Sequence, residues 1–281
     1  MISVRTLSPR RPRLLAAVVV LLATRAEGQL PTARGLPLQG EEAEAFLRTA
    51  RVTAKKSMEV GVTHAERLTL TDGERTCRAK WQTIDERRRG VTSFAGGGFV
   101  VDFTDSYKHE IAAYELDKLL GLDFVPPTVE RTLDGKPGAL QLWVEGVMTE
   151  WERSKQKVEP PDLEAWNDTM YKVRLIHQLT YNSDYRNIRN VLIDPEFRIY
   201  LIDFSRAFYP QPFLLEQKEL KRFSRSLLDS LKRLDRAQLD EKLGRSLGRP
   251  QIDGLLKRRD LIVSLAARRV AEQGEATVLY P

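Results

Sequence analysis

The stretch from Ile176 to Phe208 constrains the fold and chemistry of this chain more than any other. It reads IHQLTYNSDYRNIRNVLIDPEFRIYLIDFSRAF, a helical run followed by an Asp among polar residues and then two short apolar strands joined by a turn. Because such a turn holds the strand ends close together, we expect Asp184 and Asp203 to converge. Phosphoryl transfer uses such a pair, one carboxylate orienting the attacking hydroxyl and the other holding a metal ion with an amide oxygen. A polar β-hairpin is the alternative, and the ordered set of polar residues favours the catalytic interpretation.

Length and charge limit the class of protein. The chain has 281 residues and 42% hydrophobic content, enough to bury a core in one large domain or two lobes. The formal net charge is +6, but the first 26 residues hold five arginines and no acid, so the remainder carries 6 − 5 = +1. A nearly neutral remainder gives no electrostatic reason to expect a nucleic-acid partner.

The beginning of the chain has the pattern of an export signal. Arginines precede the apolar run Leu14 to Ala23, and the small residues Thr24 and Ala26 follow it. We therefore predict a signal peptide over residues 1–26, cleaved near Ala26, and an exported product. An uncleaved anchor is the alternative, but the run is shorter than the ~20 residues that span a bilayer, so no stable membrane insertion is expected.

Local patterns predict the elements of the first half. Residues 27–40, rich in Gly and Pro, are predicted to form a flexible leader, and Cys77 is the only cysteine, so no internal disulfide can form. The expected elements are a helix over Glu41–Lys55, strands over Ser57–Val62, Arg67–Leu70 and Arg75–Ile84, and a hairpin turn at Asp72-Gly73. The triple glycine 96–98 is interpreted as a mobile connection.

Several residues of this half are candidates for a nucleotide site. Lys80 in the last of these strands either faces solvent or reaches phosphates, and Gly61 would let backbone approach the ligand. Ser106 to Gly121 is predicted to be a helix with Ser106 as its N-cap and Gly121 at its end. Glu110 and Glu115 on this helix are both candidates for pairing with Lys80 or reaching a metal, and helical periodicity does not choose between them.

A longer motif resembles a known family. HEIAAYELDKLLGLDFVPPTVER, His109 to Arg131, together with NSDYRNIRNVLID and IYLIDFSRAF, resembles the secretory-pathway protein kinases that include the Golgi casein kinase, and their bacterial relatives. The resemblance covers roughly Gly61 to Phe208. It implies an α+β, two-lobed atypical protein kinase-like fold, with a small β-rich N-lobe over residues 41–146, a helical C-lobe over residues 147–281 and adenine between them. Strand-like Leu140 to Gly146 would form the hinge, and Val144 is its candidate cofactor-binding residue.

The resemblance also implies roles for single residues. Lys80 corresponds to the phosphate-binding lysine, and Glu110, rather than Glu115, corresponds to the Glu that pairs with lysine or helps to hold metal. Asp184 corresponds to the catalytic Asp and Asp203 to the metal-binding Asp, although the motif reads Asp203-Phe204-Ser205 instead of Asp-Phe-Gly.

The sequence departs from the family at two points. The second metal ligand stands five residues after the catalytic Asp in kinases, where this chain has Arg189, and a guanidinium cannot bind a cation. Either the loop holds one extra residue, so that Asn190 faces the metal beside Asp203 and Arg189 points away, or the ligand is lost. The animal enzymes are disulfide-stapled, so a single cysteine favours a bacterial relative.

The remaining third is predicted to be helical over Leu214–Leu234, Arg236–Leu247 and Gln251–Gln273. Together the sequence predicts an exported ATP-dependent kinase that uses Mg²⁺ or Mn²⁺ and phosphorylates a hydroxyl of a protein, sugar or small molecule. The alternative is a pseudokinase that binds nucleotide or a partner without turnover. Arg189, and the scarcity of ATP outside the cytoplasm, favour that alternative.

Overall fold

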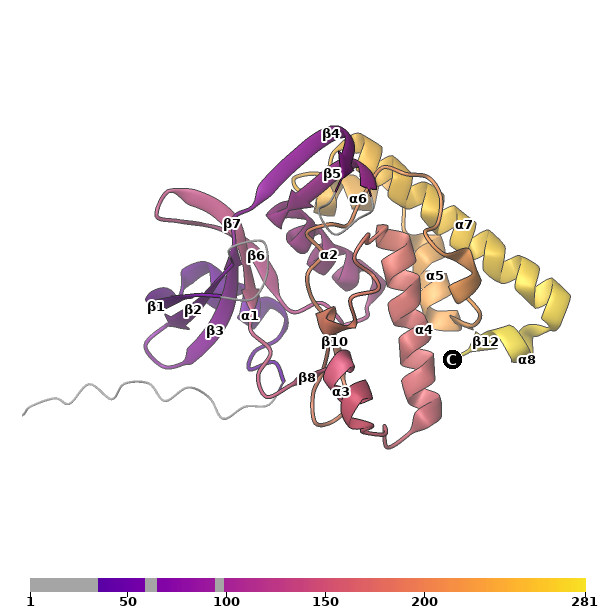
Figure 1. The fold of residues 1–281 in the computed structure, drawn as a ribbon, viewed down its shortest axis with the longest axis horizontal. Helices are drawn as coiled ribbons and strands as arrows, with labels where there is room; N and C mark the ends of the chain where they lie inside the picture. The colour runs from indigo at the N-terminus through magenta and orange to yellow at the C-terminus, as the bar shows by residue number, and fades with distance from the viewer. Residues whose placement is uncertain (1–34, 59–64, 94–98) are drawn as a thin grey trace, which may run out of the picture.

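The computed structural model describes residues 35–58, 65–93 and 99–281, which form a β-rich N-lobe and a helical C-lobe (Figure 1). The N-lobe elements are α1 (Gly40–Thr49), β1 (Arg51–Ser57), β2 (Glu66–Thr71), β3 (Thr76–Gln82), β4 (Asp85–Ser93), β5 (Phe99–Ser106), α2 (Tyr107–Leu120), β6 (Thr128–Leu133) and β7 (Lys136–Leu142). The C-lobe elements are β8 (Met148–Thr149), α3 (Glu150–Gln156), α4 (Leu163–Thr180), η1 (Ile188–Asn190), β9 (Val191–Ile193), β10 (Ile199–Leu201), η2 (Gln217–Glu219), β11 (Phe223–Ser224), α5 (Arg225–Arg233), α6 (Arg236–Leu243), α7 (Arg249–Gln273), α8 (Glu275–Val278) and β12 (Leu279–Tyr280). The predicted fold class, α+β with two kinase-like lobes, is confirmed.

An antiparallel sheet in the order β1-β2-β3-β7-β6 forms the N-lobe. Its strands alternate between a buried face and an open face, as the period of two along a strand requires. Leu68, Ala79 and Leu140 lie on the buried face, where Phe46 and Leu47 of α1 cover them. Lys80 follows Ala79 and therefore lies on the opposite face of β3, toward the C-lobe side of the sheet.

The predicted turn between β2 and β3 is present. Asp72 N donates a hydrogen bond to Arg75 O at 3.3 Å, and Gly73 has a φ of 103°, which glycine adopts without a Cβ clash. The turn sets the register that pairs Arg67 with Lys80.

Two features near the first described residues differ from the sequence predictions. The helix expected over Glu41–Lys55 ends at Thr49, because Ala50 is extended and the β-branched residues Val52 and Thr53 favour the edge strand β1. Residues 35–40, placed in a flexible leader, are packed: Gly35 bridges to Glu145 and Leu38 is buried. The expected strand over Ser57–Val62 contains only the last residue of β1, and its residues from 59, Gly61 included, lie outside the described residues, as do Gly96–Gly98.

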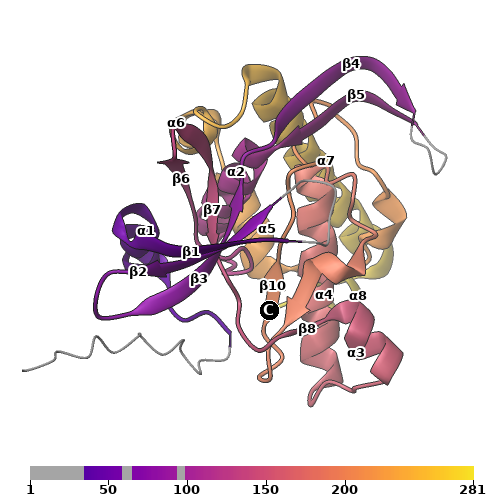
Figure 2. The same ribbon diagram turned by 60° about the vertical axis from the view of Figure 1, so that its left-hand side comes forward.

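Helix α2 forms as predicted. The Ser106 side chain accepts a hydrogen bond from Lys108 N, and Gly121 ends the helix in the left-handed region with a φ of 67°. The sequence did not predict the hairpin β4–β5 that precedes α2. This hairpin runs from the sheet over the helical lobe (Figure 2), where Thr104 N donates to Tyr209 Oη at 3.3 Å.

The C-lobe is built around α4 and the long helix α7 (Figure 1). The helices predicted over Arg236–Leu247 and Gln251–Gln273 are present as α6 and α7. The helix predicted over Leu214–Leu234 was wrong in its first half, since Phe223 and Ser224 pair in parallel with β12 and Ser224 caps a helix that starts at Arg225. In the part of the chain that the structure describes, none of these helices is long and apolar enough to cross a membrane.

Candidate active site

A lysine of the sheet meets a glutamate of α2 between the lobes. Lys80 Nζ lies 3.5 Å from Glu110 Oε1, and Glu110 Oε2 accepts a hydrogen bond from Phe204 N at 3.1 Å. Both side chains are largely buried, with 15% and 2% of their surfaces exposed. The contact ties the N-lobe sheet to α2 and to the segment after β10.

The structure chooses between the two glutamates that periodicity left open. Glu115 pairs with Lys118 at 2.9 Å on the outer side of α2, whereas Glu110 faces Lys80. Burial raises the pKa of Glu110 against the opposing effect of Lys80. Burial also disfavours the charge of Lys80, but the carboxylates of Glu110 and Asp203 outweigh it and raise the pKa of Lys80, so the ammonium stays charged.

Asp203 stands at the end of β10, where the backbone turns sharply. Its φ is 64°, a left-handed conformation uncommon for a residue with a Cβ, and such backbone strain concentrates at functional sites. Its Oδ1 lies 3.9 Å from Lys80 Nζ and accepts a hydrogen bond from Ser205 Oγ at 3.3 Å. With 37% of its side chain exposed, Asp203 faces open space beside the lysine.

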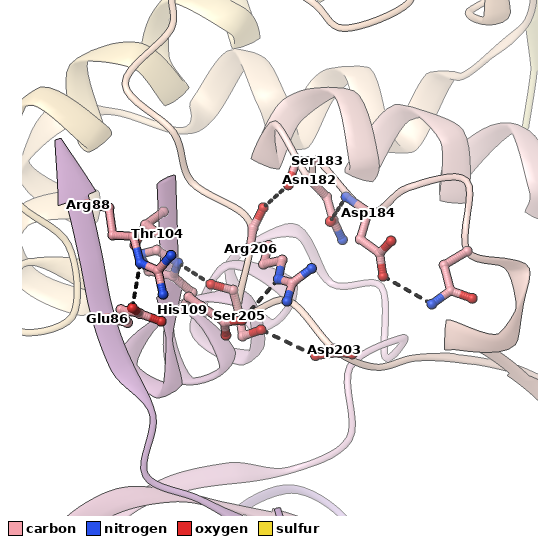
Figure 3. Close-up of polar contacts among 12 residues, drawn as sticks. Glu86, Arg88, Thr104, His109, Asn182, Ser183, Asp184, Asp203, Ser205 and Arg206 are labelled. Carbon is pink, nitrogen blue, oxygen red and sulfur yellow. Dashed lines mark hydrogen bonds and ion pairs between the residues drawn. The ribbon is translucent and has the colours of Figure 1, made fainter. Parts of the chain in front are cut away.

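Asp184 lies on the loop between α4 and η1 (Figure 3), and two amides hold its carboxylate. Nδ2 of Asn187 and Nδ2 of Asn190 each donate to Asp184 Oδ2 at 3.0 Å. Ser183 then joins this loop to the segment after Asp203, because its N and Oγ both donate to Arg206 O, at 3.1 and 3.0 Å. The hydrogen bonds bring the Asp184 and Asp203 segments together.

The residues at the departure from the kinase pattern take separate directions. Arg189 places its guanidinium carbon 3.7 Å from the centroid of the Trp151 ring, a cation–π contact on the outer face of the loop. Asn190 turns its nitrogen to Asp184, and among the described residues no hydrogen bond joins it to Asp203. The structure thus directs Arg189 away from the carboxylates without giving Asn190 the contact with Asp203 that was expected.

The linker that follows β7 holds the remaining candidate. Val144 is buried there, between Trp143, whose N donates to Arg78 O at 3.0 Å, and Glu145, which accepts from Arg78 Nε at 2.7 Å. These bonds fix the linker to β3, the strand that carries Lys80. The other predicted cofactor-binding residue, Gly61, lies outside the described residues.

Sequence reasoning missed two residues of this site, Asp105 and its partner Arg206. Asp105, at the end of β5, is buried at 2% exposure, and its Oδ2 accepts from Arg206 Nε at 2.9 Å. Its Oδ1 has no hydrogen-bond partner among the described residues. Asp105 precedes the N-cap of α2 by one residue, a signal that becomes useful only once β5 is recognised.

The oxygen ligands suit a hard cation. In the described residues, no three His, Cys, Asp or Glu side chains are grouped as a ready-made metal site. Mg²⁺ in nucleotide sites is usually held by one or two carboxylates with substrate phosphates and water. The exposed carboxylate of Asp203 and the unpaired buried oxygen of Asp105 provide ligands of that kind.

A β-rich lobe with a Lys–Glu pair, joined by a linker to a helical lobe that carries two converging aspartates, defines an atypical two-lobed kinase fold. Several solved structures share it. The chain is similar to hydra Fam20, solved with sugar, at a TM-score of 0.64 and 16% identity, over 89% of this chain and 96% of that one. It is also similar to the Golgi casein kinase, at a TM-score of 0.58 and 15% identity, over 85% of this chain and 78% of that one. The sequence matches no protein-family model and none of the curated proteins.

Proposed function

We propose that this protein is an ATP-dependent kinase that transfers the γ-phosphate to a hydroxyl group of a protein, a sugar or a small molecule. The observation that carries the proposal is the contact of Lys80 with both Glu110 and Asp203, at 3.5 and 3.9 Å, opposite the Asp184 loop. Burying a lysine and a carboxylate costs desolvation free energy, so such a pair is weak evidence for stability alone. A lysine held in this way can bind the phosphates of a nucleotide.

Each residue has a distinct part in the proposed reaction. Lys80 binds the phosphates, and Glu110 positions Lys80, because its two oxygens already face Lys80 and Phe204 N. Asp203 and Asp105 would hold Mg²⁺ or Mn²⁺, with Asn190 as a further candidate ligand. When bound, the cation would neutralise phosphate charge.

Asp184 orients the acceptor hydroxyl. Transfer breaks the bond from the γ-phosphorus to the β,γ-bridging oxygen and forms a bond to the acceptor oxygen, whose proton leaves toward Asp184. The amides of Asn187 and Asn190 hold the carboxylate in place for this step.

A pocket beside Asp184 would admit the acceptor. Its volume is about 420 Å³, and Ser183 and Tyr185, the neighbours of Asp184, are part of its lining. The other aromatic residues that line it are Tyr181, Tyr209 and Phe213. Tyrosines offer an apolar face with a polar tip, which suits a sugar ring, and hydra Fam20, a structure of the same fold, was solved with sugar. Among the three acceptor classes, these observations favour a sugar.

One observation favours the alternative, a pseudokinase. The position five residues after Asp184, where kinases place the second metal ligand, holds Arg189, whose guanidinium packs on Trp151 and cannot bind a cation. A protein of this kind would bind nucleotide without turnover.

Export is part of the proposal. The support is the apolar segment Leu14 to Ala23 in the sequence. N-terminal sequencing of the secreted protein should find a start close to Glu27, and a secreted protein that still begins with Met1 would contradict cleavage.

The roles of the two aspartates can be separated by experiment. Binding of ATP should be measured with Mg²⁺ and with Mn²⁺, and transfer followed as release or incorporation of labelled γ-phosphate. Asp203→Ala should abolish metal-dependent binding, whereas Asp184→Ala should keep binding and lose transfer. Asp229→Ala, which removes an exposed surface carboxylate of α5, serves as the control. Equal loss of binding in both site variants would contradict the assigned roles, and wild-type binding without any transfer would support the pseudokinase.

A further inference from the structure

We propose that Arg206 is a catalytic residue whose guanidinium contacts the phosphoryl group during transfer from ATP. This inference rests on the proposed kinase function and adds a cation that neither the lysine nor the metal provides. Arg206 follows Asp203 by three residues and was not singled out by the sequence.

The backbone of Arg206 lies where the two aspartate segments meet. Its carbonyl oxygen accepts both hydrogen bonds from Ser183, the residue immediately before Asp184. The peptide that carries Arg206 is therefore fixed between the acceptor-orienting loop and the metal-binding segment.

The side chain is anchored on one side only. Arg206 Nε donates to the buried carboxylate of Asp105 at 2.9 Å, and its guanidinium carbon lies 5.4 Å from the centroid of the Phe103 ring. Neither Nη atom has a hydrogen-bond partner within residues 35–58, 65–93 and 99–281, and 31% of the side chain is exposed. The bond from Nε thus fixes the orientation of the guanidinium, while the two Nη atoms are open to a ligand.

Those Nη atoms face the reaction path. Figure 3 shows the Arg206 guanidinium turned toward Asp184. Burial disfavours its charge, but Asp105, Asp184 and Asp203 together raise the pKa of Arg206. Neither Asp184 nor Asp203 forms an ion pair with it in the described chain, so the guanidinium lies near both carboxylates but beyond the ion-pair distance of either.

The chemistry of transfer calls for a cation at this place. The phosphoryl group moves from a nucleotide held at Lys80 and Asp203 to a hydroxyl held at Asp184, and negative charge is spread over its three equatorial oxygens. A planar guanidinium can bind two of those oxygens at once.

The neighbouring arginines are less suitable. Arg189 is stacked on Trp151, and Arg186 is 76% exposed with its guanidinium carbon 4.9 Å from the Tyr185 ring centroid. Arg206 is the one of the three that a buried carboxylate orients.

Binding of a phosphoryl-transfer mimic tests the inference without knowledge of the acceptor. Dissociation constants of the full chain should be measured for ADP with Mg²⁺, alone and with aluminium fluoride, which occupies the place of the transferring group. We expect Arg206→Ala to weaken the fluoride complex by about 10- to 100-fold, the range of a charge-assisted hydrogen bond, and to change ADP binding by less than about 3-fold. Arg206→Lys should recover part of the loss.

A matched control exists in the C-lobe. Arg222 is 29% exposed and pairs with Asp168 at 3.1 Å, so Arg222→Ala removes a similar ion pair far from the site. It should leave both dissociation constants unchanged. Added guanidinium ion should restore fluoride-complex binding to Arg206→Ala, which a merely structural defect would not allow.

The outcomes separate the inference from the function on which it rests. If Arg206→Ala bound ADP like the wild type, and aluminium fluoride strengthened binding equally in both proteins, the role of Arg206 alone would be overturned. The same would follow if aluminium fluoride did not strengthen the binding of ADP to the wild type. If the wild-type chain bound neither ADP nor ATP, the proposed kinase function would fail first and the inference with it.

Discussion

His109 makes the stability of the region around the candidate active site sensitive to acid. The side chain lies on α2 next to Glu110 and is 3% exposed. Its Nδ1 is 2.9 Å from Ser205 O, and its Nε2 is 3.0 Å from Gln251 Nε2 on α7. A neutral ring that donates from Nδ1 and accepts at Nε2 satisfies both partners, whereas a protonated ring would set two donors against each other.

The size of the effect follows from the pKa. Burial lowers the pKa of His109 from 6.5 to about 4. The folded state therefore binds fewer protons than the unfolded state, so the contribution of the neutral ring to stability is complete above pH 6.5 and is lost as the pH falls through about 4. Because the two states bind different numbers of protons at His109, the free energy of unfolding should fall by about 2.5 kcal/mol between pH 7.5 and pH 4.5.

Urea unfolding of the wild type and of His109→Gln at pH 7.5 and 4.5 measures this loss. Titration of all other groups cancels when the two pH-dependent changes are subtracted. We expect the wild type to lose about 2.5 kcal/mol more than His109→Gln between the two pH values. Gln251→Ala removes the facing donor but keeps the buried imidazole, so its pH-dependent loss should lie between those of the wild type and His109→Gln. Equal losses in the wild type and His109→Gln would refute the argument.

Three further predictions use the same unfolding assay. Burial raises the pKa of Asp117 from 3.8 to about 7, so the wild type should lose about 2.5 kcal/mol relative to Asp117→Asn as the pH rises from 5 to 7.5, and parallel curves would contradict this. Leu38→Ser should lower the free energy of unfolding by about 2 kcal/mol because Leu38 is buried, whereas Leu163→Ser, at a residue 60% exposed, should change it little. Arg258→Met should lower the free energy of unfolding by about 3 kcal/mol, since the fully buried guanidinium donates to the carbonyl oxygens of Leu179, Tyr209 and Gln211, and an unchanged value would show that those carbonyls find other donors.

Elements with local signals could be predicted from the sequence. Helix α2 carries its own N-cap and its own terminating glycine, and the β2–β3 hairpin carries Asp72-Gly73 at the turn. The strands β9 and β10 are short, apolar and separated by a turn, which is why Asp184 and Asp203 could be expected to converge.

Elements that depend on distant partners could not be predicted from the sequence. Strand β4 reads DERRRGVTS, mostly exposed, and is ordered by its pairing with β5. Phe223 and Ser224 interrupt a helical pattern because they pair with Leu279 and Tyr280 at the far end of the chain. Asp105 and Arg206 escaped notice for the same reason, since each acquires its role from a contact across 101 positions of the sequence.

The one-residue shift in the loop after Asp184 has a structural cause. Asn187 accepts a hydrogen bond from Arg189 N at 3.3 Å and so caps the short 3₁₀ helix η1. This turn directs Arg189 outward to Trp151 and brings Asn190 inward to Asp184. The extra residue therefore strengthens the hold on the Asp184 carboxylate. Asn190 donates its amide nitrogen to Asp184, so its amide oxygen would still be available to a cation, and this single side chain could hold the Asp184 carboxylate and the proposed metal ion together.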